Sequence, residues 1–227
     1  MTLKSLLAGV WVGAASAALA SGGGMRPMQP MQQSMPQGQT PSQKATGYYN
    51  QGVKLTRKAD DAGKSAEDST DPGKKAKAAR EAQDKYSEAR KQFEQAVQND
   101  PSMPEAWNYL GYTNRKLGSY DQALAAYQKA LALKPGYADA LEYRGEAYLG
   151  MNHLPDAKQA YLDLYATNRE QAQKLLNAMH AWVTAQRATS GGPSPGIDDF
   201  DKWIQEREQI AHATAALTRA GTAAAWH

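Results

Sequence analysis

Apolar positions recur with the period of an α-helix through the middle of the chain. Within residues 104–116, Trp107 and Leu110 begin a stripe at spacing i, i+3, i+4, i+7, which is typical of one helix face. Gly118 follows, and glycine can take the left-handed conformation that ends a helix. A second amphipathic stretch spans residues 120–133 and stops at a Lys-Pro-Gly sequence. The pattern therefore predicts a helical hairpin.

The same pattern returns further along the chain at a fixed interval. Gly145 takes the place of Gly111, and Tyr161 takes the place of Tyr127. The interval of about 34 residues lies in the range of helical repeats. A fixed period of this size indicates a solenoid, in which each hairpin buries its faces only by stacking on its neighbours.

These two units resemble the tetratricopeptide repeat, whose pattern is W-x2-L-G-x2-Y, then A-x3-F, then P. The residues that carry the resemblance are Trp107, Leu110, Gly111, Ala123, Tyr127, Ala130 and Pro135 in one unit, and Gly145, Tyr148, Ala157 and Tyr161 in the next. Asn114 departs from the pattern, which has Tyr at that place. The resemblance implies an all-α, right-handed solenoid of helical hairpins with about three repeats and with C-terminal capping helices.

The first repeat is interrupted. Gly52 is the counterpart of Gly111, but the two glycines are separated by far more than one period. The predicted insert is the polar run 60–73, which ends in an Asp-Pro-Gly turn signal. After it, a second helix is expected to start near Lys74 and to protrude. With this insert, the array is predicted to span residues 45–168.

Three further segments follow the array. Residues 169–189 carry an apolar stripe that suits a capping helix, since the last repeat of a solenoid otherwise leaves an open apolar face. Residues 190–196 form a Gly-, Ser- and Pro-rich linker, and residues 197–220 form a C-terminal amphipathic helix. Its apolar face consists of Phe200, Trp203, Ile204, Ile210 and Leu217. Packing on the array and capture by a partner are both open for this helix.

The N-terminal region is predicted to direct export. Residues 1–20 combine Lys4, a short apolar stretch and a small-x-small site at Ala18-Leu19-Ala20, as a cleavable signal peptide does. The apolar stretch is too short for a membrane anchor, so no stable membrane insertion is expected after cleavage. Residues 21–44 are rich in Met, Gln and Pro and are predicted to be a disordered tether. The expected location is the periplasm of a bacterium, with secretion as the alternative.

Composition and charge exclude several classes of function. The formal net charge is +3, which is too balanced to indicate a nucleic-acid partner. Cysteine is absent, which excludes thiol catalysis and cysteine-based zinc sites. The four histidines share no i, i+4 spacing, and no serine lies in a G-x-S-x-G motif. We therefore expect no enzymatic activity and no cofactor.

Four methionines cluster in the predicted tether, namely Met25, Met28, Met31 and Met35. Thioethers are soft ligands that select Cu(I), so these residues are a weak candidate for a metal site. They support an alternative function, that of a periplasmic accessory or carrier protein with a Cu(I)-binding tail.

The resemblance also implies where a partner would bind. In tetratricopeptide arrays the first helix of each unit lines a concave groove. The positions expected to face that groove are Tyr49, Asn108, Tyr112, Arg115, Lys116, Asp139, Glu142, Tyr143 and Glu146. Tyr and Arg are frequent anchors of protein interfaces. The predicted function is a non-enzymatic interaction module or scaffold of the bacterial cell envelope, binding a peptide or protein segment in the groove.

Overall fold

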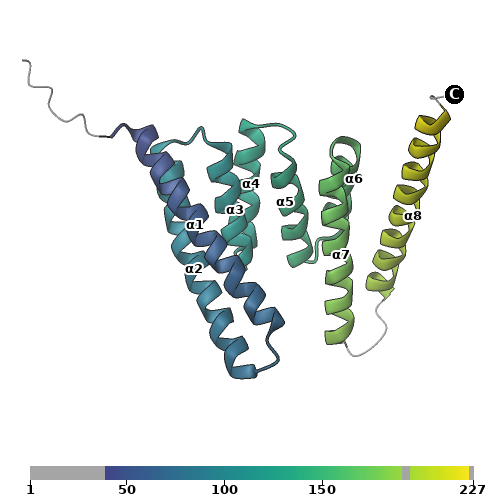
Figure 1. Ribbon diagram of the computed structural model, residues 1–227, viewed down its shortest axis with the longest axis horizontal. Helices are drawn as coiled ribbons and strands as arrows, with labels where there is room; N and C mark the ends of the chain where they lie inside the picture. Colours follow the sequence, from purple (N-terminus) through teal and green to yellow (C-terminus); the bar gives the residue numbers. More distant parts are fainter. Residues whose placement is uncertain (1–38, 191–194, 225–227) are drawn as a thin grey trace, which may run out of the picture. The chain divides into compact units, whose positions relative to one another are not determined.

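The computed structural model describes residues 39–190 and 195–224, and all regular structure in these ranges is α-helical. The helices, which follow one another in chain order in Figure 1, are α1 (Pro41–Asp68), α2 (Pro72–Asn99), α3 (Pro104–Lys116), α4 (Tyr120–Leu133), α5 (Ala138–Gly150), α6 (Leu154–Thr167), α7 (Arg169–Ser190) and α8 (Pro195–Ala224). Each helix packs on the next, and α5 also packs on α7. The prediction of an all-α array of helical hairpins is confirmed. The predicted signal peptide and the four clustered methionines lie outside the described residues.

Helix α1 begins inside the segment 21–44 that was predicted to be a disordered tether. The Thr40 side chain accepts a hydrogen bond from the Gln43 backbone N–H at 3.3 Å, and the Gln43 side chain accepts one from the Thr40 N–H at 2.9 Å. This reciprocal cap, followed by Pro41 in the first turn, satisfies N–H groups that a helix start leaves free. The predicted boundary of the tether is therefore wrong.

The polar run 60–73, predicted to be an insert, lengthens two helices. Helices α1 and α2 have 28 residues each and are separated by a short turn. Small residues at helical spacing make the extension possible, because Ala62 and Ala66 are buried in this hairpin. Asp71 caps α2 by accepting a hydrogen bond from the Lys74 N–H at 2.8 Å. The additional residues of the predicted insert are therefore helical except at the turn, and the predicted helix start near Lys74 lies close to the observed one.

The next two hairpins repeat each other in length. Helices α3 and α5 have 13 residues each, and α4 and α6 have 14 each. Gly118, after α3, has a φ of 77°, as predicted for a residue that ends a helix, and Asn152, one repeat later, has a φ of 59°. Asn168 separates α6 from α7, and its side chain accepts a hydrogen bond from the Gln171 N–H at 3.1 Å.

Small residues allow the helices of a hairpin to approach closely. A Cβ atom on Gly111 would lie 2.5 Å from the Tyr127 ring, and one on Gly52 would lie 2.6 Å from the Phe93 ring. Each aromatic ring therefore occupies the space that a side chain on the glycine would need. Among the predicted signature residues, the following are at most 2 % exposed: Ala123, Tyr127, Ala130, Ala157 and Tyr161.

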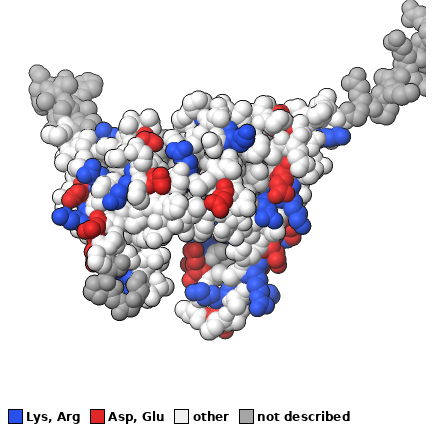
Figure 2. Space-filling model, turned by 180° about the vertical axis from the view of Figure 1, so that it is seen from behind, with Lys and Arg blue, Asp and Glu red and all other residues white. Residues whose placement is uncertain are grey.

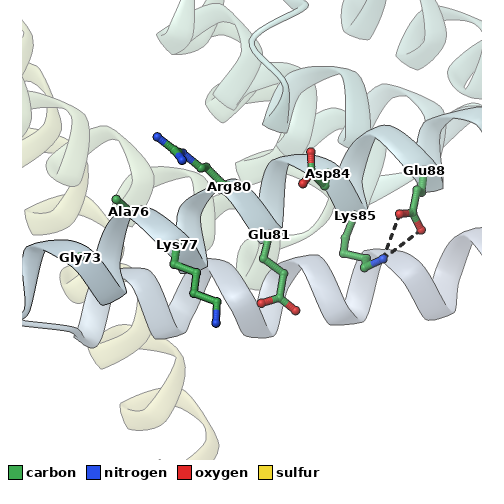
Figure 3. A pocket seen from close by; sticks show the side chains of 8 residues that line it. All are labelled: Gly73, Ala76, Lys77, Arg80, Glu81, Asp84, Lys85 and Glu88. Carbon is green, nitrogen blue, oxygen red and sulfur yellow. Dashed lines mark hydrogen bonds and ion pairs between the residues drawn. The ribbon is translucent and has the colours of Figure 1, made fainter.

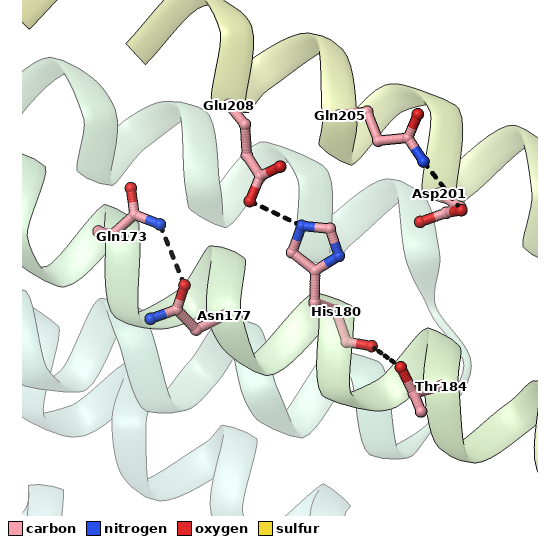
Figure 4. Close-up of polar contacts among 7 residues, drawn as sticks. All are labelled: Gln173, Asn177, His180, Thr184, Asp201, Gln205 and Glu208. Atoms are coloured by element: carbon pink, nitrogen blue, oxygen red, sulfur yellow. Dashed lines mark hydrogen bonds and ion pairs between the residues drawn. The ribbon is translucent and has the colours of Figure 1, made fainter. Parts of the chain in front are cut away.

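Helix α8 packs on the array. Phe200 and Ile204 are buried, and the ring centroids of Trp203 and Tyr161 lie 5.5 Å apart. Polar contacts fix the same helix to α7, since His180 Nε2 and Glu208 Oε1 are 2.8 Å apart (Figure 4).

Two details of the C-terminal predictions need correction. The helices extend into the predicted linker 190–196, because Ser190 ends α7 and Pro195 begins α8. On the predicted apolar face of α8, Ile210 and Leu217 are 44 % and 74 % exposed, so they contribute little to the packing on the array.

Charges of both signs are intermingled on the face shown in Figure 2, where no broad basic surface forms. None of the helices in residues 39–190 and 195–224 combines the length and the apolar character that crossing a bilayer requires.

Candidate protein-binding surface

The first feature of the candidate surface is a carboxylate that joins three helices. Asp60 of α1 accepts hydrogen bonds on its Oδ1 atom from the hydroxyl of Tyr86 in α2, at 2.5 Å, and from the hydroxyl of Tyr112 in α3, at 2.7 Å. Burial and the hydrogen bond to Asp60 raise the pKa of both tyrosines. Both hydroxyls therefore stay protonated and donate at neutral pH.

The second feature is an arginine between two tyrosine rings. The guanidinium carbon of Arg115 lies 5.2 Å from the Tyr112 ring centroid and 5.4 Å from that of Tyr143. Arg115 also forms an ion pair with Glu146 of α5. Burial works against its charge, but Glu146 and Tyr127 outweigh burial and raise the pKa of Arg115. The charge therefore has partners on both α3 and α5, as a buried cation requires.

The third feature is a buried carboxylic acid beside this ion pair. Glu142 is 5 % exposed, and burial together with a hydrogen bond to Glu146 raises its pKa to about 9. Glu142 therefore keeps its proton at pH 7, and its O–H group donates a hydrogen bond to Glu146. Glu142 thus adds no second negative charge beside the ion pair of Arg115 and Glu146.

Lys116 completes the set at the end of α3. Its amine lies 5.6 Å from the Tyr86 ring centroid and 5.9 Å from that of Tyr112, and its side chain is exposed. We call the following residues the tyrosine–arginine cluster: Asp60, Tyr86, Tyr112, Arg115, Lys116, Glu142, Tyr143 and Glu146.

The structure separates the remaining predicted groove residues from this cluster. Tyr49 packs edge-on against Tyr109, with ring centroids 5.8 Å apart. Asp139 accepts a hydrogen bond from Gln171 of α7, so it serves the contact between α5 and α7. Asn108 is 2 % exposed.

Two residues were wrongly predicted to face outward. Asn108 and Glu142 occupy equivalent places in α3 and α5, and both are buried. On its own helix, each of these residues has polar neighbours. The stacking of the next hairpin covers both residues. They therefore support the surface from below and are not available to a partner.

The sequence prediction missed Asp60 and Tyr86. Asp60 had been assigned to the predicted insert 60–73. A continuous α1 puts Asp60 on the same face as Tyr49 and Val53, at spacing i, i+4, i+11. Extending the helical period through the polar run would have found it.

Another hollow has a different character. Figure 3 shows that α2 alone lines it, with mostly exposed and charged side chains, including Lys85 bonded to Glu88 at 2.9 Å. A hollow along one helix encloses little, so it gives no binding site. Among residues 39–190 and 195–224, no three His, Asp or Glu side chains are grouped so as to hold a metal ion.

Comparison with known proteins agrees with the repeat pattern. The tetratricopeptide-repeat family profile matches residues 74–138 and 115–172. The PEX5-related protein of Rattus norvegicus is 34 % identical over 68 residues, which are 30 % of this chain and 11 % of that protein. The chain thus spans only a small part of this relative.

Two solved structures are similar at low identity. The first TPR domain of human RPAP3 has a TM-score of 0.45 and 19 % identity, covering 64 % of this chain and 97 % of that one. The MamA protein has a TM-score of 0.38 and 22 % identity, covering 73 % of this chain and 92 % of that one. Over residues 74–172 the chain is thus similar to tetratricopeptide repeats by the profile match, and the same residues form helical hairpins.

Proposed function

We propose that the tyrosine–arginine cluster binds a segment of another protein. Tetratricopeptide-repeat domains generally mediate protein–protein interactions. The observation that carries the proposal is the pair Tyr112 and Tyr143, which are half-buried with ring centroids 5.0 Å apart. Asp60 and Arg115 hold these rings in place, so the rings would lose little freedom on binding. Rigid, partly exposed tyrosines are typical anchors of interfaces.

The charges indicate what such a segment would carry. Lys116 is exposed and forms no ion pair within the described residues, whereas Glu146 is already paired with Arg115. Glu142 is buried and neutral at pH 7. We therefore propose a segment that presents a carboxylate to Lys116 and an apolar side chain to the tyrosine rings.

A matched pair of variants tests this proposal. A photoreactive benzoylphenylalanine at position 116 should crosslink a partner in cell-envelope extracts, whereas the same residue at position 77 should not. In the purified complex, Lys116→Gln should weaken binding about tenfold, since a charge-assisted contact contributes roughly 1.5 kcal/mol. Lys77→Gln is the control, since Lys77 of α2 is exposed and forms no ion pair with any residue that the structure describes. Equal binding by both variants would place the interface elsewhere.

The proposed place of action is the bacterial cell envelope. Residues 1–20 support it through their n-region, apolar stretch and small-x-small site. Intact mass of the chain recovered from an osmotic-shock fraction should correspond to a start at Ser21. A chain that keeps Met1 and remains with the cytoplasmic fraction would contradict export.

A further inference from the structure

A second hollow, of about 520 Å³, lies between α2, α3 and α4. Trp107, Leu110 and Asn114 of α3 line it, together with Arg90 of α2 and with Ala125 and Lys129 of α4. Asn114 is two residues after Tyr112, which places it about 200° further around the helix axis. The hollow and the tyrosine–arginine cluster therefore use different sides of α3.

Asn114 and Arg90 present polar atoms to this hollow, and Arg90 Nε is buried without a hydrogen-bond partner within the described residues. Asn114 is 6 % exposed, and its side chain makes no hydrogen bond with any residue in the ranges 39–190 and 195–224. The polar atoms of the Asn114 amide are not among the fully buried ones, so they remain reachable from the hollow. Since no side chain of the described residues occupies this amide, a ligand in the hollow can form hydrogen bonds with it.

The equivalent place in the next hairpin holds a much larger side chain. Tyr148 stands one repeat after Asn114, is half-buried and packs against the apolar core of α5 to α8. In the first hairpin, Leu55 stands three residues after Gly52, as Asn114 stands three after Gly111, and is buried. A tyrosine therefore fits this position of a hairpin, and the smaller Asn114 leaves the volume open.

The walls and rim of the hollow define the rest of the ligand. Trp107, Leu110 and Ala125 offer apolar surface. Lys129 is exposed at the rim and forms no ion pair within the described residues, whereas Arg90 has Glu94 at 3.6 Å. A planar apolar ring with one hydrogen-bonding end, next to a carboxylate, complements these features.

We infer that the hollow binds a tyrosine side chain of a partner protein, with the phenol hydroxyl on the Asn114 amide and an adjacent acidic residue near Lys129. This site goes beyond the proposed function, because it lies on another side of α3 and recognises a different group. A partner could occupy both sides of the array, and either contact can fail without the other.

The full mature chain, labelled with ¹⁵N, is titrated with acetyl-Tyr-Glu-amide, and the backbone amides of α3 are followed by NMR. We expect shifts centred on residues 107–114 with a Kd on the order of 1 mM, the affinity of a small ligand. Acetyl-Ala-Glu-amide should give no shifts. Asn114→Tyr, which fills the hollow from within, should weaken binding at least tenfold.

A second variant keeps the inference testable if Asn114→Tyr does not fold. Ala125→Phe fills the hollow from the exposed side of α4, where folding does not depend on the side chain, and should also weaken binding at least tenfold. Lys129→Gln should weaken binding of the Tyr-Glu probe and leave acetyl-Tyr-Gln-amide unaffected. Equal shifts in wild type and in Ala125→Phe, or equal binding of acetyl-Phe-Glu-amide or acetyl-Leu-Glu-amide, would overturn the inference.

Discussion

The hairpins α3–α4 and α5–α6 have the same helix lengths but use equivalent positions differently. Gly111 faces the Tyr127 ring of its own hairpin, whereas Gly145 faces the Leu175 side chain of α7. On the inner side, Tyr112 of α3 corresponds to Glu146 of α5. The backbone pattern is therefore repeated, while the contacts and the chemistry are not.

This difference shows what a repeat specifies. Small residues at fixed spacing determine how closely helices approach. Different side chains can pack against such a small residue in different hairpins. The polar residues around them are particular to each hairpin. Much of the proposed binding surface consequently lies where the two hairpins differ, at α3 and its contacts with α5.

The largest expected effect distinguishes the two glycines. Gly111→Ala should lower the free energy of unfolding by about 2 kcal/mol, because the added Cβ would meet a buried aromatic ring that cannot move aside. Gly145→Ala should cost less than about 1 kcal/mol, since the methyl groups of Leu175 can rotate and alanine favours the helix. Urea unfolding of both variants measures the difference.

Gly47→Ala is the control for this pair. No atom lies within 4 Å of the Cβ position at Gly47, so the variant should gain up to about 1 kcal/mol from helix propensity alone. Equal costs at positions 111 and 145 would show that the two hairpins are packed alike after all.

The next effect concerns Glu142, which occupies the same place in α5 as Asn108 does in α3. The pKa of Glu142 is raised to about 9 from an ordinary value of 4.5, so the folded chain binds a proton that the unfolded chain releases. Its contribution to stability is complete below about pH 4.5 and is lost as the pH rises toward 9. Glu142→Gln keeps an uncharged hydrogen-bond donor at this position, so it should remove the loss of stability at high pH.

We expect Glu142→Gln to match the wild type at pH 5 and to exceed it by on the order of 1 kcal/mol at pH 8. Denaturant unfolding at both pH values gives the comparison, and the difference between the two proteins isolates this one group. Parallel pH profiles would mean that Glu142 is ionised in the folded chain.

The smallest effect lies at the turns of the two hairpins. Gly118 and Asn152 have φ values of 77° and 59°, where alanine is strained. Gly118→Ala should therefore cost about 1 kcal/mol, and Asn152→Gly should change stability by only a few tenths of a kcal/mol. Thermal unfolding followed by circular dichroism would detect the first change. A neutral Gly118→Ala would indicate that this turn can adopt another conformation.

The sequence was sufficient for the parts of the fold that depend on local spacing. The stripe through Trp107 and Leu110, the buried Ala123 and the turn at Gly118 all follow from residues close together in the chain. The long α1 was missed because polar residues in its second half hide a spacing of small residues such as Ala62. Alanine carries a weak apolar signal, although it packs well between close helices.

The candidate surface was only partly predictable for a related reason. Tyr112, Arg115 and Lys116 follow from their places on one helix, and the structure brings all three into the tyrosine–arginine cluster. The burial of Glu142 depends on how neighbouring hairpins stack. Stacking is a long-range property, and no window of sequence contains it.

The turn between α1 and α2 offers a practical attachment point for a reporter. Each of these helices has 28 residues against 13 or 14 in the next four, which is about 20 Å of additional length at 1.5 Å per residue. Thr70 is exposed and lies between Ser69, the C-cap of α1, and Asp71, the N-cap of α2. A fluorophore or affinity handle at position 70 would leave both caps intact and avoid both proposed contact surfaces.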